Sequence, residues 1–319
     1  MAGRRTVRRG ALAGAVAGVL VLALAGCQTG RADDGGDAGA GGEGDVSDGG
    51  DVSGDLPEIS GDGSTLVLQV RSGGGFVPWG YDFATVPSLS VYADGTAIVH
   101  GPTTLEYPGK ALPNLQVVHL ADGALDEIVA AAADADLLAP GPDYGMPNVT
   151  DLPTTTVTIA VGGETFEHGA YALGAGPGET ASGDEGMFGG GESGLTDEQS
   201  AARVALAQFV QRATDLVGAA GGDESYAITA LGVLAMAVDP ATQVDVEGID
   251  VQVLPWPVEA VALSGAGQCA LVEGADAQTL LATLAEANQL TQFEQDGVTY
   301  QTWFRPLLPD ETGCADLVG

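Results

Sequence analysis

The distribution of apolar residues decides which part of this chain can build a hydrophobic core. Residues 28–63 consist mainly of Gly, Asp, Ala, Ser and Glu, with almost nothing apolar to bury. Such a composition cannot offset the entropy lost on folding, so we expect a disordered acidic tether over residues 27–63. A flexible chain of that length spans on the order of 30–35 Å. The folded part therefore begins at about Ser64.

Residues 1–26 have the three parts of an export signal. Four arginines (4, 5, 8 and 9) precede an apolar run from Ala11 to Ala25, and small residues follow. A membrane-spanning helix is the rival interpretation, but the 16 residues 11–26 fall short of the ~20 that a span needs. Residues 8–12 resemble a degenerate twin-arginine motif, so that export route stays open beside the general secretory route, which we favour.

The end of this signal, Leu24-Ala25-Gly26-Cys27, resembles the lipobox of bacterial lipoproteins. The resemblance implies that diacylglycerol is attached to the Cys27 thiol and that the chain is cleaved before Cys27. We expect palmitate among the acyl chains. Two acyl chains suffice for stable attachment where one is marginal. We therefore expect a lipid-anchored protein on the extracytoplasmic face of the cell membrane.

The charge of the exported chain excludes some classes of partner. Without the signal, six Lys and Arg stand against 44 Asp and Glu, which gives a formal charge of −38. Such a surface repels phosphate backbones and anionic lipid headgroups. We therefore expect no nucleic-acid binding, and membrane contact through the lipid on Cys27 alone.

The cysteines predict one disulfide. With Cys27 lipidated, Cys269 and Cys314 remain, both in the last fifth of an exported chain. We expect them to be bonded, which would close a loop of about 45 residues and contribute roughly 3–4 kcal/mol in the chain-entropy model. The chain contains no Cys-x-x-Cys motif for redox chemistry.

The pattern over residues 64–218 predicts an α+β domain, with a Gly-rich loop at 174–194. Alternating or hairpin-like runs predict strands at 65–70, 88–92, 96–99, 115–120, 155–161 and 164–168. A helix is expected after Asp122 as its cap, and a second one after the capping-box pair Thr196 and Gln199. The order favours an antiparallel sheet with helices on one face.

This layout resembles small uncharacterised domains in lipoproteins of high-GC Gram-positive bacteria. The matching elements are Gly73-Gly74-Gly75, the hairpin from Pro87 to Gly95 and the run Thr154-Thr155-Thr156. The resemblance implies a fold, and no established function comes with it.

Residues 225–319 predict a second, smaller α+β domain. Apolar runs at 228–238 and 244–254 favour strands, Asp276 is a candidate cap for the next helix, and a hairpin turns over Asp296-Gly297. The proposed disulfide would join the C-terminal tail to the strand before that helix. Arg305 has Asp310 and Glu311 nearby and is expected to form an ion pair with one of them.

The catalytic motifs that we searched for are missing. The chain has no G-x-S-x-G, no H-E-x-x-H and no Ser/Lys pair of the penicillin-binding type, and Gly109-Lys110-Ala111 lacks the other parts of a phosphate loop. Hydrolysis by paired carboxylates stays open because acidic side chains are abundant. The sequence assigns no catalytic residue and no cofactor.

The sequence assigns no metal site either, although two alternatives stay open. His100, His119 and His168 lie on expected strands without metal-ligand spacing, so only the fold could bring them together around zinc. Asp143 and Asp151 flank the Tyr144-Gly145 loop and could serve calcium, without an EF-hand pattern.

The best candidate binding surface is the segment 73–83. It holds Phe76, Trp79, Tyr81 and Phe83 in a chain that is only 5% aromatic. Trp and Tyr on loops can be rigid binding anchors. The structural alternative is that these rings fold into the core.

Together these observations predict a lipid-anchored binding module of the cell envelope, whose partner is an envelope protein or a small ligand. An envelope hydrolase and a small-ligand or cation receptor are the alternatives. A pair of carboxylates with one raised pKa would favour the hydrolase. An enclosed pocket beside the aromatic segment would favour the receptor.

Overall fold

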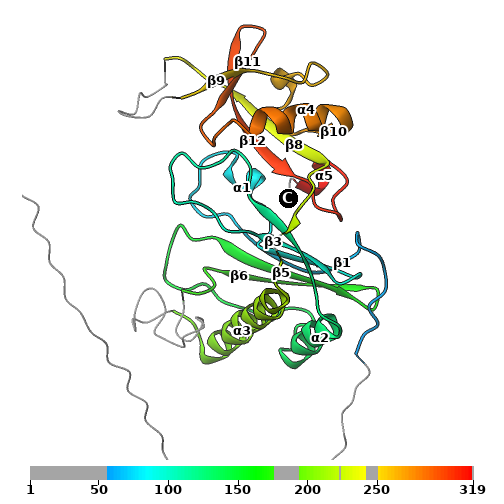
Figure 1. Ribbon diagram of the computed structural model, residues 1–319. Helices are drawn as coiled ribbons and strands as arrows, with labels where there is room; N and C mark the ends of the chain where they lie inside the picture. The colour runs from blue at the N-terminus through cyan, green and yellow to red at the C-terminus, as the bar shows by residue number, and fades with distance from the viewer. Residues whose placement is uncertain (1–55, 176–193, 223, 242–250, 318–319) are drawn as a thin grey trace, which may run out of the picture. The chain divides into compact units, whose positions relative to one another are not determined.

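The structure is a computed structural model that describes residues 56–175, 194–222, 224–241 and 251–317 (Figure 1). Residues 53–319 form one compact unit. The signal, Cys27, most of the expected tether and the Gly-rich stretch lie outside the described residues. Two sheets with mostly antiparallel strands, together with several helices, confirm the α+β class.

The larger sheet is formed by the first part of the chain. Its strand order is β6 (Glu164–Tyr171), β5 (Thr154–Val161), β1 (Leu66–Gly73), β2 (Leu89–Tyr92), β3 (Thr96–His100), β4 (Leu115–His119) and β7 (Glu224–Ser225), and all neighbours are antiparallel. The expected hairpins are confirmed. Gly95 (φ 80°), Gly162 (φ 61°) and Gly163 (φ 79°) supply the left-handed backbone that these tight turns require.

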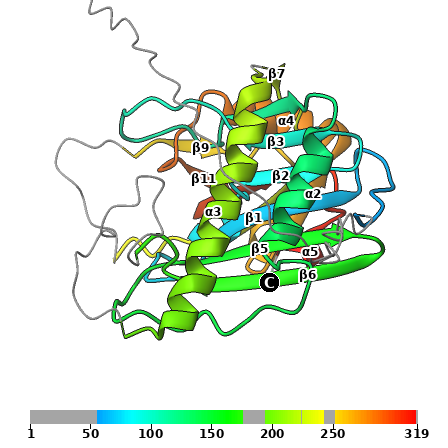
Figure 2. The same ribbon diagram turned by 90° about the horizontal axis from the view of Figure 1, so that it is seen from below.

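Two helices, α2 (Ala124–Asp134) and α3 (Asp197–Ala220), lie across one face of this sheet (Figure 2). Ile128, Leu206 and Phe209 pack with the inward side chains of the strands, such as Leu68 and Val157. Alternation along each strand sends every second side chain into this core. The opposite face is therefore lined by the remaining positions.

The predicted N-cap of α3 is confirmed, and the predicted N-cap of α2 is wrong. Thr196 Oγ1 accepts the Gln199 N–H at 3.2 Å, and the Gln199 side chain accepts the Thr196 N–H at 2.9 Å. At α2 the N-cap is Gly123 (φ 83°), and no side chain caps the helix. A turn in which the Ala124 N–H bonds to the Ala121 carbonyl leads into the helix, so Asp122 lies before its first turn.

The smaller sheet has the order β10 (Ala270–Glu273), β8 (Ala230–Ala237), β12 (Val298–Pro306), β11 (Gln292–Gln295) and β9 (Val253–Pro255). Only β9 runs parallel to its neighbour. Of the strand expected at 244–254, residues 244–250 are outside the described part, and β9 begins at its end. The hairpin over Asp296 (φ 54°) and Gly297 (φ 79°) is confirmed.

Helix α4 (Gly274–Leu284) covers one face of the smaller sheet through Ala277, Leu280 and Leu284. Its N-cap is Glu273, so the expectation that Asp276 caps it is wrong. Asp276 lies in the first turn, where a carboxylate still interacts favourably with the helix dipole. The helix begins before Asp276 because Gly274 (φ 61°) changes the direction of the chain directly after β10.

Residues after β12 cover part of the free face of the larger sheet. Leu308 packs into a cluster with Val86, Tyr92, Ile98 and Leu115. Tyr92 Oη donates to Asp310 Oδ1 at 2.8 Å, and Tyr226 Oη donates to the Leu307 carbonyl at 2.8 Å. Burial raises the pKa of Tyr226 to about 12, and burial together with the Asp310 carboxylate raises the pKa of Tyr92, so both hydroxyls stay protonated as donors at neutral pH.

The disulfide between Cys269 and Cys314 is confirmed, with a Cα–Cα distance of 5.8 Å. It joins the residue before β10 to the first residue of α5 (Cys314–Leu317). Leu317 then packs with Phe83, Leu234 and Leu307. The bond therefore fixes the C-terminal segment in the position from which it lines the pocket described below.

Candidate functional site

The aromatic segment divides into an exposed part and a buried part. Phe76, Trp79 and Tyr81 are 89%, 47% and 56% exposed, whereas Phe83 is only 8% exposed. Helix α1 (Tyr81–Ala84) causes this division, because Tyr81 begins the short helix on its outer side and Phe83 points inward. Three rings of the segment are therefore at the surface, and Phe83 is in the core.

The exposed rings stand on a fixed base. Trp79 packs edge-on against Trp303 of β12, with ring centroids 4.9 Å apart. Gly80 has φ 83°, and a Cβ there would lie 2.4 Å from the Trp303 ring, so only glycine lets the backbone approach so closely. Asp82 Oδ1 accepts the Gly74 N–H at 3.0 Å. These contacts hold the segment at both ends.

A cleft of about 710 Å³ begins beside Tyr81. Its other wall comes from residues 102–114, including Tyr107, which is 64% exposed. We use the name aromatic surface for Phe76, Trp79, Tyr81 and Tyr107. Tyr107 was not identified from the sequence, because the two loops that line the cleft are separated by a hairpin.

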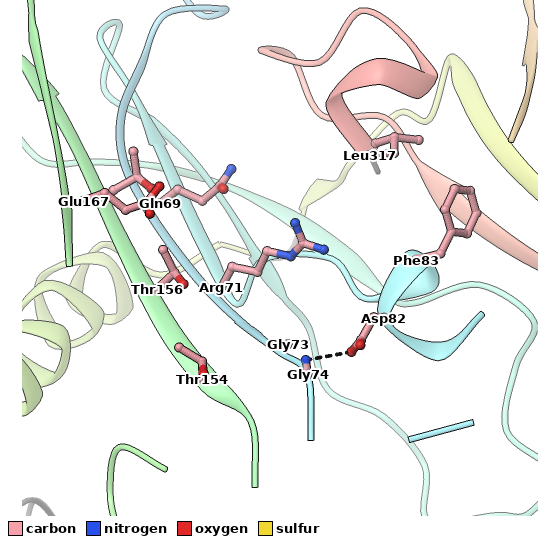
Figure 3. A pocket seen from close by; sticks show the side chains of 11 residues that line it. Gln69, Arg71, Gly73, Gly74, Asp82, Phe83, Thr154, Thr156, Glu167 and Leu317 are labelled. Atoms are coloured by element: carbon pink, nitrogen blue, oxygen red, sulfur yellow. Dashed lines mark hydrogen bonds between the residues drawn. The ribbon is translucent and has the colours of Figure 1, made fainter. Parts of the chain in front are cut away.

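A second cavity, of about 550 Å³, lies on the part of the larger sheet that Leu308 leaves uncovered. Gln69 and Arg71 of β1 point into it, with threonines of β5 and Glu167 of β6 beside them (Figure 3). Asp82, Phe83 and Leu317 line the other side. We call this cavity the polar pocket.

Strand register places these polar side chains in rows. Gln69 pairs with Thr158, which pairs with Glu167; Arg71 pairs with Thr156, which pairs with Gly169. The intervening residues of each strand face the helix-covered core. Polar residues at every second position of β1 and β5 were the available signal for this pocket, and sequence reasoning did not use it.

Arg305 forms the expected ion pair, and Glu311 is its partner. Arg305 Nη2 lies 2.6 Å from Glu311 Oε1, and their side chains are 5% and 8% exposed. Glu311 Oε2 also accepts the Leu308 N–H at 2.7 Å, and the other guanidinium nitrogen donates to the Pro306 carbonyl. Burial raises the pKa of Glu311, but its contacts are those of a structural pair and not of a catalytic acid.

The three histidines lie in separate environments. His168 is buried, its Nε2 donates to the Leu137 carbonyl at 2.9 Å, and its Nδ1 lies 2.8 Å from the Tyr144 hydroxyl in a second hydrogen bond. His100 and His119 lie on β3 and β4, near the Val86 carbonyl and Glu224 respectively. Within the described ranges, no three His, Cys, Asp or Glu side chains gather as metal ligands would.

The candidate calcium residues have local partners. Asp143 accepts the Gly145 N–H at 2.8 Å and the Gln199 side chain at 2.9 Å, and these bonds lower its pKa. Asp151 Oδ2 accepts the Thr150 hydroxyl at 3.3 Å. Asp143 thus ties its loop to the start of α3.

Arg203 of α3 is buried, which the sequence analysis did not predict for a charged side chain. Its guanidinium donates to the Tyr171 and Ala172 carbonyls at 2.9 and 2.8 Å. It thereby satisfies backbone groups at the end of β6. Ala172, with φ 52°, is the strained residue that this contact holds.

No helix in the described part of the chain is long and apolar enough to span a bilayer. Comparison of the chain with protein-family models, with curated proteins and with solved structures finds no significant match.

Proposed function

We propose that the protein is a lipid-anchored binding module on the extracytoplasmic face of the cell membrane. The sequence features that support this are the signal at residues 1–26 and Cys27 at the end of a lipobox-like motif. The Cys269–Cys314 disulfide also supports it, because such bonds persist mainly outside the reducing cytoplasm. The acidic residues between Cys27 and the first sheet would separate the folded part from the bilayer.

Replacing the lipidated cysteine tests the anchor. We expect Cys27→Ser to move the protein from the membrane fraction to the soluble exported fraction, because the chain then loses its acyl groups. Mass spectrometry of the N-terminal peptide of the wild-type protein should show diacylglyceryl-cysteine. Recovery of Cys27→Ser in the membrane fraction to the same extent as wild type would contradict lipid anchoring.

The aromatic surface is the proposed contact surface for a protein partner. The observation that carries this proposal is the exposure of Phe76, Trp79 and Tyr81 on a base fixed by Trp303. Rigid exposed aromatic side chains lose little entropy on binding and dominate many interfaces. Since the chain is strongly acidic, the partner that fits it best is an envelope protein with a basic surface around an apolar groove.

Substitution of the exposed rings tests this surface. We expect the triple variant Phe76→Ala, Trp79→Ala, Tyr81→Ala to bind the partner at least about 100-fold more weakly, because each aromatic anchor can contribute 2 kcal/mol or more. The measurement is co-purification after mild crosslinking in membranes, followed by titration of the identified partner. Association of the wild type should also slow as salt is raised.

The control replaces three exposed apolar residues outside the aromatic surface, Met146, Met236 and Val298, by alanine. Both triple variants should keep the wild-type circular dichroism spectrum and unfold in one cooperative transition, although loss of the Trp79–Trp303 contact lowers the melting temperature of the aromatic variant. A partner that binds the two variants equally well would contradict the assignment of the surface. A partner whose association does not respond to salt would contradict its basic character.

A further inference from the structure

The polar pocket holds a cation, Arg71, whose side chain forms no direct hydrogen bond or ion pair within the described residues. Among the cations in the described residues, Arg305 pairs with Glu311, Arg212 pairs with Glu127 at 3.1 Å, and Arg203 donates to backbone carbonyls. Lys110 is exposed. Arg71 is half-buried and, in that part of the chain, makes no side-chain hydrogen bond or ion pair. Its charge interacts with Glu311 and Arg305 only beyond ion-pair distance. The guanidinium donors are therefore available to a ligand.

The surroundings of Arg71 suit the recognition of a carboxylate. The guanidinium presents a planar set of donors that matches a carboxylate in bidentate geometry. Thr156 lies opposite Arg71 on β5, and its hydroxyl faces the same cavity. On the next strand the row ends in Gly169, where an added Cβ would meet only Thr154 Cγ2, at 3.9 Å. That glycine leaves open space beside Thr156, at the β6 edge of the row.

The pocket carries charges of both signs, so neither a simple anion nor a simple cation matches it. Asp82 and Glu167 line it as well, and in Figure 3 Arg71 lies between them. An anion would be repelled by both carboxylates, and a simple cation would be repelled by Arg71. Asp82 is fixed by the Gly74 N–H on Oδ1, which leaves Oδ2 available to accept from a ligand.

We propose that the polar pocket binds a small zwitterion, an α-amino acid or short peptide, with its carboxylate on Arg71 and its ammonium on Asp82. Phe83 and Leu317 form an apolar wall for the ligand's side chain. A cavity of about 550 Å³ falls within the range of small-molecule sites. This site is separate from the aromatic surface and does not depend on a protein partner.

Calorimetric titration of the detergent-purified full chain tests the proposal. The probes are the twenty amino acids, dialanine, and the two half-ligands acetate and methylammonium. We expect at least one zwitterion to bind, and both half-ligands to bind at least about tenfold more weakly. Arg71→Gln should weaken zwitterion binding at least about tenfold. Asp82→Asn, which keeps the acceptor for the Gly74 N–H, should weaken it similarly.

Gly169→Leu provides a test that leaves all charges in place. The substitution should weaken binding at least about tenfold by filling the space beside Thr156, without forcing an unfavourable backbone angle. The matched control Arg212→Gln removes an exposed cation on α3 and should bind as wild type does. No binding by folded wild type, binding unchanged in Arg71→Gln, or acetate binding as tight as the zwitterion would each overturn the proposal.

Discussion

The double variant Cys269→Ser, Cys314→Ser should be less stable than the oxidised wild type by about 3–4 kcal/mol, which is the chain-entropy value for this loop. The bond joins two cysteines that are 45 positions apart in the sequence. It also holds α5, whose Leu317 packs with Phe83 and Leu307. Without the bond, the terminal segment has only this packing and its hydrogen bonds to keep it in place.

Urea denaturation of the variant and of the wild type, with and without reductant, measures this loss. Reduced wild type should match the double variant, because both lack the same constraint on the unfolded chain. The variant itself should not respond to reductant. A loss of unfolding free energy below about 1 kcal/mol would contradict the chain-entropy account of this bond.

The free energy of unfolding of the variant Glu311→Gln should be about 3–5 kcal/mol lower than that of the wild type. This is the range measured when one partner of a buried ion pair is removed. Glutamine keeps the shape and the oxygen that can accept the Leu308 N–H, so the change is chiefly the loss of the negative charge. Arg305, which is 4% exposed, would then be a buried cation without its counter-charge. The loss should appear as a lower urea midpoint.

An exposed pair in the same protein supplies the control. Arg212 and Glu127 lie 3.1 Å apart, but their side chains are 59% and 58% exposed. Glu127→Gln should therefore lower the free energy of unfolding by only about 0–1 kcal/mol. The double variant Arg305→Met, Glu311→Leu should regain most of the loss, because it removes both buried charges. Equal losses for Glu311→Gln and Glu127→Gln would contradict the role given to burial.

Sequence reasoning was most successful where the determinant is local. Asp94-Gly95, Gly162-Gly163 and Asp296-Gly297 each mark a hairpin, because their positive-φ residues favour the turn itself. Thr196 and Gln199 mark the start of α3 because both hydrogen bonds of the capping box form within four residues.

The incorrect caps show the limit of such local signals. Asp122 and Asp276 are good N-cap residues, yet α2 and α4 follow Gly123 and Glu273. In both cases a glycine with positive φ, Gly123 or Gly274, sets the direction in which the helix leaves the strand before it. The requirement to pack the helix against its sheet outweighed a cap contribution of about 1 kcal/mol.

The two candidate sites depend on contacts between distant parts of the chain. Trp79 is positioned by Trp303, and the polar pocket exists because β1 pairs with β5 and the C-terminal α5 lies opposite. Pairing between distant strands leaves no signature in either strand alone. The sequence therefore identified the aromatic segment but could not separate its exposed residues from Phe83, and it did not identify Arg71 as a site residue.

Site-specific photocrosslinking in membranes tests most directly whether the aromatic surface binds a partner. A photoreactive residue would replace Phe76 in one variant and Met146, which is 70% exposed, in another. We predict one discrete adduct from position 76, absent from position 146 and lost when Trp79→Ala is added. The absence of an adduct at position 76, or equal adducts from both positions, would contradict a binding role for this surface.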